Sequence, residues 1–177
     1  MSKKVLIVHG WGGSDAPHWQ SWLADELVKN NNQVYFLKFN EIEYPHLSAW
    51  SNELSDALDE FKPDVVVCHS VACTLWFHLC NAKRIQVVKE LYLVAPPSMT
   101  CDIVELKSFF PIKTPKTLYA RDAILVISTN DPYMTLDEAK ILQKELNVKM
   151  EILEGAGHIN ADSNFGRWPW ILEQIND

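Results

Sequence analysis

The chain has 177 residues, of which 47% are hydrophobic and 22% are charged, and its formal net charge is -7. This length predicts a single domain over residues 1–177, and the composition is typical of a folded protein rather than a disordered one. The acidic balance lacks the basic patch that nucleic-acid binding requires, so we expect no nucleic-acid partner.

The apolar run nearest the N-terminus, Val5–Val8, is shorter than the core of a signal peptide, and no run approaches the ~20 apolar residues of a membrane span. We therefore expect a cytoplasmic protein with no membrane partner. The cysteines Cys68, Cys73, Cys80 and Cys101 lack the C-x-x-C spacing of a structural zinc site. Reduced, mostly buried thiols are the expected state, and neither a metal nor a cofactor is expected.

Short apolar runs rich in β-branched or aromatic residues alternate with stretches of helical periodicity. The predicted strands are Val5–Val8, Val34–Phe39, Val65–Val67, Leu91–Val94, Ile124–Ile127 and Lys149–Leu153. The predicted helices are Pro17–Lys29, Leu47–Phe61, Val71–Ala82 and one that begins at the capping box Thr135-Leu136-Asp137-Glu138 and ends near Leu146. The segment Pro96–Asp122 lacks a clear period and is expected to wrap the surface near the site, with a short helix near Ile103–Phe109.

Strands that are apolar almost throughout and are separated by helices indicate a parallel sheet covered on both faces. We predict an α/β fold, a three-layer α/β/α sandwich with a mostly parallel six-stranded sheet in the order 2-1-3-4-5-6. Ligands bind such sheets at the carboxyl ends of the strands beside the switch point, here His9–Gly13 and Cys68–Val71. Only about thirty residues separate the fourth and fifth strands, too few for a cap domain, so the site should be open.

One serine, Ser70, links a buried strand to an apolar helix. This is the arrangement of a nucleophile elbow, in which a sharp turn presents the serine hydroxyl above the sheet. The usual G-x-S-x-G runs here from Cys68 to Ala72, with both glycines replaced. Ser70 could equally be the N-cap of the following helix. The other partners decide between these interpretations, because a serine hydroxyl needs a neighbouring base to become a good nucleophile.

A candidate acid and a candidate base follow the last two predicted strands. Asp131 follows the fifth strand and His158 follows the sixth, so both are expected at the same sheet edge as Ser70. The order Ser, Asp, His along the chain is the order in α/β-hydrolases. Asp131 could instead close an Asx turn before the next proline, and His158 could be a polar loop residue. Asp102 is the second-choice acid, whereas Asp122 lies at the wrong end of its strand.

A glycine-rich loop, His9–Gly13, follows the first predicted strand. Its backbone can approach a ligand closely, and the amides of Trp11 and Val71 are the expected oxyanion-hole donors. The alternative is a dinucleotide phosphate loop. Against that alternative, Asp15 occupies the position of the third glycine in G-x-G-x-x-G, where its charge would repel a pyrophosphate.

Aromatic residues near the expected site are candidate substrate contacts. They are Trp19, Phe165 and Trp168, together with Trp11 and the backbone of Gly10. Core or surface packing is the alternative for each aromatic side chain. The remaining histidines at positions 18, 46, 69 and 78 show no H-E-x-x-H or similar ligand spacing, and we interpret them as packing or helix-start residues.

Several longer motifs carry a family resemblance. They are His9-Gly10-Trp11-Gly12-Gly13, His18-Trp19-Gln20-Ser21-Trp22-Leu23, His69-Ser70, Val94-Ala95-Pro96, Asn130-Asp131-Pro132-Tyr133, Gly155-Ala156-Gly157-His158-Ile159-Asn160 and Ser163-Asn164-Phe165-Gly166. In these motifs the chain resembles, nearly end to end, the small serine hydrolases of the RBBP9/YdeN family within the α/β-hydrolase superfamily. The resemblance implies a minimal α/β-hydrolase fold without a cap domain and a triad of Ser70, Asp131 and His158. Cys68 and Ala72 depart from the glycines usual at the elbow.

The expected function is hydrolysis of a small ester, thioester or amide through an acyl-enzyme. Ser70 is the expected nucleophile, His158 the general base and Asp131 the acid that orients the histidine. Two alternatives use the same scaffold: a protein-binding module with little turnover, suggested by the altered elbow, and an acyltransferase with an acceptor other than water. The expected partner is the small-molecule substrate, and a protein partner stays open.

Overall fold

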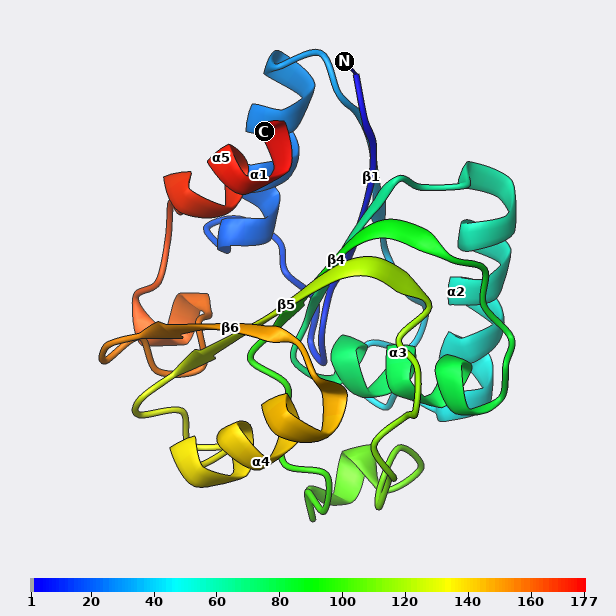
Figure 1. The fold of residues 1–177 in the computed structure, drawn as a ribbon, viewed down its shortest axis with the longest axis vertical. Coiled ribbons are helices and arrows are strands. Elements are labelled where there is room, and N and C mark those ends of the chain that lie inside the picture. The colour runs from blue at the N-terminus through cyan, green and yellow to red at the C-terminus, as the bar shows by residue number, and fades with distance from the viewer. Residues whose placement is uncertain (1) are drawn as a thin grey trace.

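The computed structural model describes residues 2–177 and is built around one six-stranded sheet (Figure 1). The strands are β1 (Lys4–Val8), β2 (Gln33–Leu37), β3 (Val65–His69), β4 (Val88–Val94), β5 (Ala120–Ser128) and β6 (Lys149–Leu153). Every neighbouring pair is parallel, and the order β2-β1-β3-β4-β5-β6 confirms the predicted α/β fold. All carboxyl ends therefore lie at one edge of the sheet, where ligands bind in such folds.

Helices cover both faces of the sheet. They are α1 (Trp19–Lys29), α2 (Leu47–Phe61), α3 (Val71–Asn81), α4 (Leu136–Leu146) and α5 (Pro169–Asn176). Helices α1 and α5 pack on one face, and α2, α3 and α4 pack on the other, which gives the predicted three layers (Figure 1). None of these helices, within residues 2–177, combines the length and apolar character needed to cross a bilayer.

Strand β1 shows why the sequence has apolar runs without alternation. Leu6 and Val8 enter the core beneath α2 and α3, whereas Val5 and Ile7 enter the core beneath α1 and α5. All four side chains are fully buried. A strand that is covered by helices on both faces needs apolar residues at every position. The apolar run of β1 is therefore typical of an inner strand, and β1 does lie between β2 and β3.

The structure differs from the prediction mainly outside the sheet. Helix α5 was not predicted, although Pro169 at its first position is a typical helix start. The short helix expected near Ile103–Phe109 is a single 3-10 turn at Val104–Leu106. The connection between β4 and β5, residues 95–119, holds no other helix, and the fold has no cap domain.

The predicted capping box at the start of α4 is confirmed. Thr135 Oγ1 accepts a hydrogen bond from the Glu138 N–H at 3.3 Å, and Glu138 Oε2 accepts one from the Thr135 N–H at 2.8 Å. Each side chain thereby satisfies a backbone donor that the first turn of a helix leaves unpaired. Because α4 follows the loop that carries Asp131, the box also fixes where that loop ends.

Replacement of Thr135 by Ala removes the cap acceptor and should lower the free energy of unfolding by about 1 kcal/mol. Thr135→Ser keeps a hydroxyl at the same place and should stay close to the parent protein. Urea denaturation of the three proteins measures the difference. Equal stability of the Ala and Ser variants would show that the cap contributes nothing.

Candidate active site

Ser70 occupies the turn between β3 and α3 with a strained backbone, φ 58° and ψ -129°. A serine held in this conformation is the hallmark of a nucleophile elbow. The turn is anchored by the hydrogen bond from the Ser70 N–H to the Val94 carbonyl at 2.9 Å. Ser70 does stand at the N-cap position of α3, but its hydroxyl makes no capping hydrogen bond. The side chain is directed instead to the edge of the sheet.

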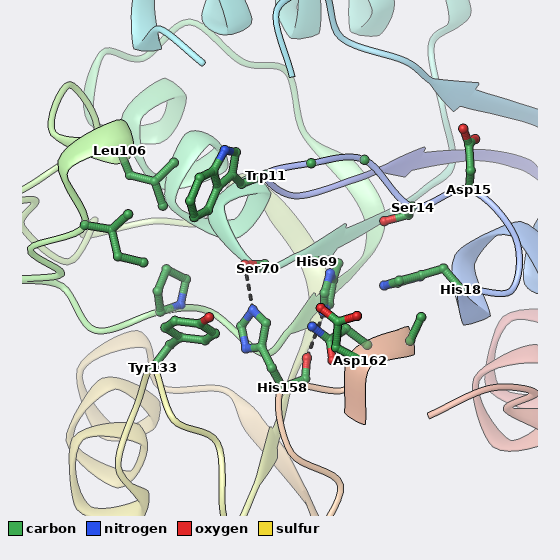
Figure 2. Close-up of a pocket in the computed structure, with 16 residues that line it drawn as sticks. Trp11, Ser14, Asp15, His18, His69, Ser70, Leu106, Tyr133, His158 and Asp162 are labelled. Atoms are coloured by element: carbon green, nitrogen blue, oxygen red, sulfur yellow. Dashed lines mark hydrogen bonds between the residues drawn. The ribbon is translucent and has the colours of Figure 1, made fainter. Parts of the chain in front are cut away.

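The Ser70 hydroxyl meets His158 at that edge. Ser70 Oγ lies 2.8 Å from His158 Nε2 (Figure 2), and His158 Nδ1 lies 2.9 Å from Asp131 Oδ2. An ionised carboxylate can only accept, so Nδ1 carries the proton and Nε2 of the neutral ring is left as an acceptor for the serine proton. The side chains of His158 and Asp131 are only 8% and 3% exposed, so little water competes for these hydrogen bonds.

Asp131 also closes an Asx turn, in which Oδ1 accepts a hydrogen bond from the Tyr133 N–H at 2.9 Å. The two interpretations of this residue are therefore compatible, because one carboxylate serves the turn and the histidine together. The turn also places the Tyr133 ring edge-on to the imidazole of His158, with ring centroids 4.6 Å apart. Asp102 and Asp122 are exposed, and neither contacts His158 within residues 2–177.

The loops that follow β5 and β6 are joined by side chains of the first loop. Three consecutive residues, Ser128 to Asn130, each accept a hydrogen bond from a backbone N–H just before His158. The bonds are Ala156 N–H to Ser128 Oγ at 2.9 Å, Gly155 N–H to Thr129 Oγ1 at 3.0 Å and Gly157 N–H to Asn130 Oδ1 at 2.7 Å. The position of His158 is thus fixed relative to the loop of Asp131.

Two glycines make the close approaches possible. Gly157 has φ 56°, and a Cβ there would collide with the side chain of Ser163, whose Oγ accepts the His158 N–H at 3.1 Å. A Cβ on Gly10 would lie 2.8 Å from the Cβ of Ser70. Only glycine lets the loop after β1 pass this close to the elbow.

His69, the residue before Ser70, holds the His158 loop from below. Its Nε2 lies 3.0 Å from the backbone carbonyl of His158, and this carbonyl can only accept, so Nε2 carries the proton. Sequence reasoning interpreted His69 as a packing residue and missed this contact. No signal in the sequence reveals it, because the two residues are 89 positions apart.

A cavity of about 500 Å³ opens beside Ser70 and His158 (Figure 2). This volume is in the range of small-molecule sites. Its lining comes from the loop after β1, the connection between β4 and β5, and the loops after β5 and β6. The lining residues are Trp11, Gly12, Gly13, Ser14, Asp15, His18, His69, Ser70, Pro97, Ile103, Leu106, Tyr133, His158, Asn160, Ala161 and Asp162.

Most of the predicted substrate contacts lie elsewhere. Trp19 is fully buried, donates its indole N–H to the Ile159 carbonyl at 2.7 Å and packs edge-on against Trp168, with ring centroids 5.1 Å apart. Both tryptophans belong to the core between the sheet and helices α1 and α5, because they continue the apolar stripes of that layer. Phe165 packs on Trp168, and Gly10 lies under Ser70, so neither lines the cavity. Of the predicted aromatic contacts, Trp11 does line it.

The two amides predicted as oxyanion donors flank the serine. Val71 is the first residue of α3, and Trp11 lies in the glycine-rich loop beside the elbow. Within residues 2–177, neither backbone N–H donates to a backbone or side-chain acceptor. Both are therefore available to an oxygen atom in the cavity.

Three histidines beside the site are held neutral. Burial lowers the pKa of His18 to about 4, and the nearby His158 and His9 act in the same direction. Burial also lowers the pKa of His69 well below its ordinary value and lowers the pKa of His9. Their hydrogen bonds then fix which ring nitrogen carries the proton.

The thiols around the elbow are buried, and burial raises the pKa of Cys68 and Cys73 and brings the pKa of Cys80 to about 12. These thiols stay protonated and are poor nucleophiles. Within residues 2–177, no group of three or more His, Cys, Asp or Glu side chains is arranged to hold a metal ion. Unlike these thiols, the Ser70 hydroxyl lies beside both a base, His158, and the open cavity.

The profile of a family described as serine hydrolase matches residues 5–177. The chain belongs to the serine hydrolase family. This chain is 24% identical over 185 aligned positions to the YdeN protein of Bacillus subtilis (strain 168). The alignment covers 99% of this chain and 95% of that protein. The resemblance to the small YdeN-like hydrolases is thereby confirmed.

Solved structures show the same fold for this serine hydrolase. The crystal structure of the ydeN product of B. subtilis superposes with a TM-score of 0.85 at 20% identity and covers 99% of this chain and 97% of that one. A YdeN-like protein from Pectobacterium atrosepticum gives 0.79 at 22% identity, with coverage of 98% and 89%. Est1E of Butyrivibrio proteoclasticus with bound ferulic acid gives 0.69 at 14% identity, with coverage of 99% and 90%. At these identities the likeness establishes the α/β-hydrolase fold alone.

The neutral state of His18 predicts a pH-dependent stability. Between its unfolded pKa of 6.5 and its folded pKa of about 4, the unfolded chain binds a proton that the folded serine hydrolase does not. The free energy of unfolding should therefore fall as the pH drops through this window. His18→Asn keeps a helix-cap acceptor and should reduce the slope by up to about one proton.

Urea denaturation at several pH values measures that slope. His46→Asn changes the cap of α2 in the same way at an exposed position outside the cavity and is the matched control. An unchanged slope in the His18 variant would contradict the assignment of a neutral buried imidazole.

Proposed function

We propose that this protein hydrolyses a small ester, thioester or amide through an acyl-enzyme formed on Ser70. The observation that carries the proposal is the continuous hydrogen-bonded chain from Ser70 Oγ through His158 to Asp131, with distances of 2.8 Å and 2.9 Å. A serine hydroxyl is a weak nucleophile until a base accepts its proton, and here the base is in hydrogen-bonding distance and is itself oriented by an acid.

The reaction has two halves. In the first, Ser70 Oγ bonds to the substrate carbonyl carbon while its proton passes to His158 Nε2. The tetrahedral intermediate then collapses, and the leaving alcohol, thiol or amine takes that proton. In the second half, water attacks the acyl carbon and gives a proton to the same nitrogen. The bond from that carbon to Ser70 Oγ then breaks, Ser70 takes the proton back from His158, and the carboxylic acid is released. Asp131 stabilises the imidazolium in both halves and keeps the ring in the required tautomer.

The negative charge that develops on the carbonyl oxygen needs donors that are already in place. The unpaired N–H groups of Val71 and Trp11 supply them in this proposal. The close approach of Gly10, the residue before Trp11, to Ser70 supports this assignment.

Two alternatives share the scaffold. A binding module without turnover would not need the serine hydroxyl aligned with a histidine and a carboxylate, so the geometry favours the hydrolase. An acyltransferase would use the same first half-reaction and differ only in the acceptor. Product analysis with added alcohols or amines separates it from a hydrolase.

Ser70→Ala should abolish labelling by a fluorophosphonate probe and lower kcat for p-nitrophenyl butanoate by at least about 10⁴-fold, because the attacking oxygen is removed. Ser55→Ala removes a serine hydroxyl from helix α2, outside the cavity, and is the control. Gel fluorescence and initial rates measure the two effects. Undiminished labelling of the Ser70 variant would refute the proposal.

Asp131→Asn should lower kcat by about 10⁴-fold without unfolding the protein, since an amide can stabilise the wrong tautomer of His158. Asp102→Asn tests the second-choice acid and should leave kcat within about twofold, because this exposed carboxylate makes no hydrogen bond to the imidazole within residues 2–177. Rates and thermal unfolding of both variants decide the point. A larger loss in the Asp102 variant would reassign the acid.

A further inference from the structure

The cavity beside Ser70 has two unlike halves. Figure 2 shows Trp11, Leu106 and Tyr133 on one side of the serine, and Ser14, Asp15 and His18 on the other. The first side presents mainly aromatic and aliphatic surface, with the Tyr133 hydroxyl as a polar group, and the apolar residues Ile103 and Pro97 also line the cavity. The second side consists of groups that can form hydrogen bonds. A ligand that fills the whole cavity must therefore have two chemically different ends.

The Ser14 hydroxyl on the polar side has no partner. Ser14 is only 4% exposed, and its Oγ is buried without a hydrogen bond within residues 2–177. An unsatisfied buried hydroxyl is costly for a fold, so such groups usually have a functional explanation. Figure 2 shows the side chain directed into the cavity, on the same side as His18.

His18 offers a second group with a defined role. It is 6% exposed, and its Nδ1 accepts the Gln20 N–H at 3.2 Å as the cap of α1. Because the buried ring is neutral, the proton lies on Nε2, and that N–H has no acceptor within residues 2–177. The polar half thus presents an uncharged N–H donor next to an unpaired hydroxyl.

The charges around the polar half exclude an anionic ligand. The cavity lining described above contains carboxylates, Asp15 and Asp162, and no Lys or Arg. Asp15 is paired with Lys38 at 2.8 Å on the surface, so that lysine is already engaged. A carboxylate on the substrate would find no lysine or arginine in the lining as a counterion, and the charge of Asp162 would repel it.

We propose that Ser14 and His18 form a subsite for an uncharged hydrogen-bond acceptor, such as an amide carbonyl or a hydroxyl. The preferred substrate is then an ester with one apolar end, seated against Trp11 and Leu106, and one neutral polar end. This inference rests on the proposed hydrolase function and specifies its substrate class.

Isosteric substrates test the subsite. On the acyl side, p-nitrophenyl N-acetylglycinate is compared with p-nitrophenyl pentanoate and with the p-nitrophenyl hemiester of glutarate. On the alcohol side, the pentanoate ester of N-acetylethanolamine is compared with that of pentan-1-ol. In at least one of these pairs, the protein should have the higher kcat/KM for the amide-bearing ester, and the glutarate hemiester should be the poorest of its set.

Variants connect that preference to the two residues. Ser14→Ala and His18→Asn should each lower the ratio of kcat/KM for the amide-bearing ester to that for its apolar isostere by about 3- to 10-fold, the effect of one lost hydrogen bond. Asn at position 18 can still cap α1. Ser55→Ala, which removes another buried hydroxyl without a partner, and His46→Asn, which changes the other histidine cap, are matched controls that should leave the ratio unchanged.

The outcomes separate the two proposals. A purely structural role of Ser14 or His18 would change both esters of a pair equally. Unchanged ratios in both variants, or a preference for the glutarate hemiester, overturn the subsite while hydrolysis of the pentanoate esters leaves the proposed function standing. If the parent protein hydrolyses none of the esters, both proposals fail.

Discussion

The attachment of the His158 loop to its neighbours is the constraint on which the rest of the site depends. Strand β6 is the outermost strand of the sheet and is only partly buried. Its pairing with β5 alone would therefore hold the following loop weakly. Side chains of Ser128 to Asn130 add hydrogen bonds from one loop to the other, and His69 binds the His158 carbonyl from the elbow. The imidazole is therefore fixed from two directions, which is what proton transfer over 2.8 Å requires.

Sequence reasoning found the sheet and the three aligned side chains for one physical reason. Parallel strands place their carboxyl ends at one edge, so residues that directly follow them, such as Ser70, Asp131 and His158, meet without further assumptions. It misplaced Trp19 and Trp168, because an aromatic residue near the site in sequence looks the same in a core and in a cavity. It expected the connection after β4 to lie near the site, but it did not single out Leu106 there or Ser14, since loop conformation is set by contacts between distant segments rather than by local pattern.

The buried histidines show how packing and function share the same region. His9 and His18 each use one ring nitrogen to accept a backbone N–H, from Phe39 and Gln20. The other ring nitrogen of His9 donates to the Gly10 carbonyl, so both nitrogens are hydrogen-bonded within the fold. His18 keeps the second nitrogen unpaired and lines the cavity. Both histidines accept a backbone N–H, but only His18 has a ring nitrogen left for a hydrogen bond to a ligand.

The elbow has Cys68 and Ala72 in place of two glycines, and the structure shows why glycine is not needed at these positions. Cys68 and Ala72 are fully buried in the core beneath α3, where helix and strand are in contact, and a small side chain fits there without displacing the turn. The thiol of Cys73 reaches back to the carbonyls of Cys68 and Val94, both at 3.5 Å, and so helps to join helix and strand. Beside the elbow, Gly10 on the loop after β1 tolerates no side chain, because its Cβ would meet Ser70 itself. Glycine is therefore required where the neighbouring loop faces Ser70, and the elbow keeps its geometry without glycines of its own.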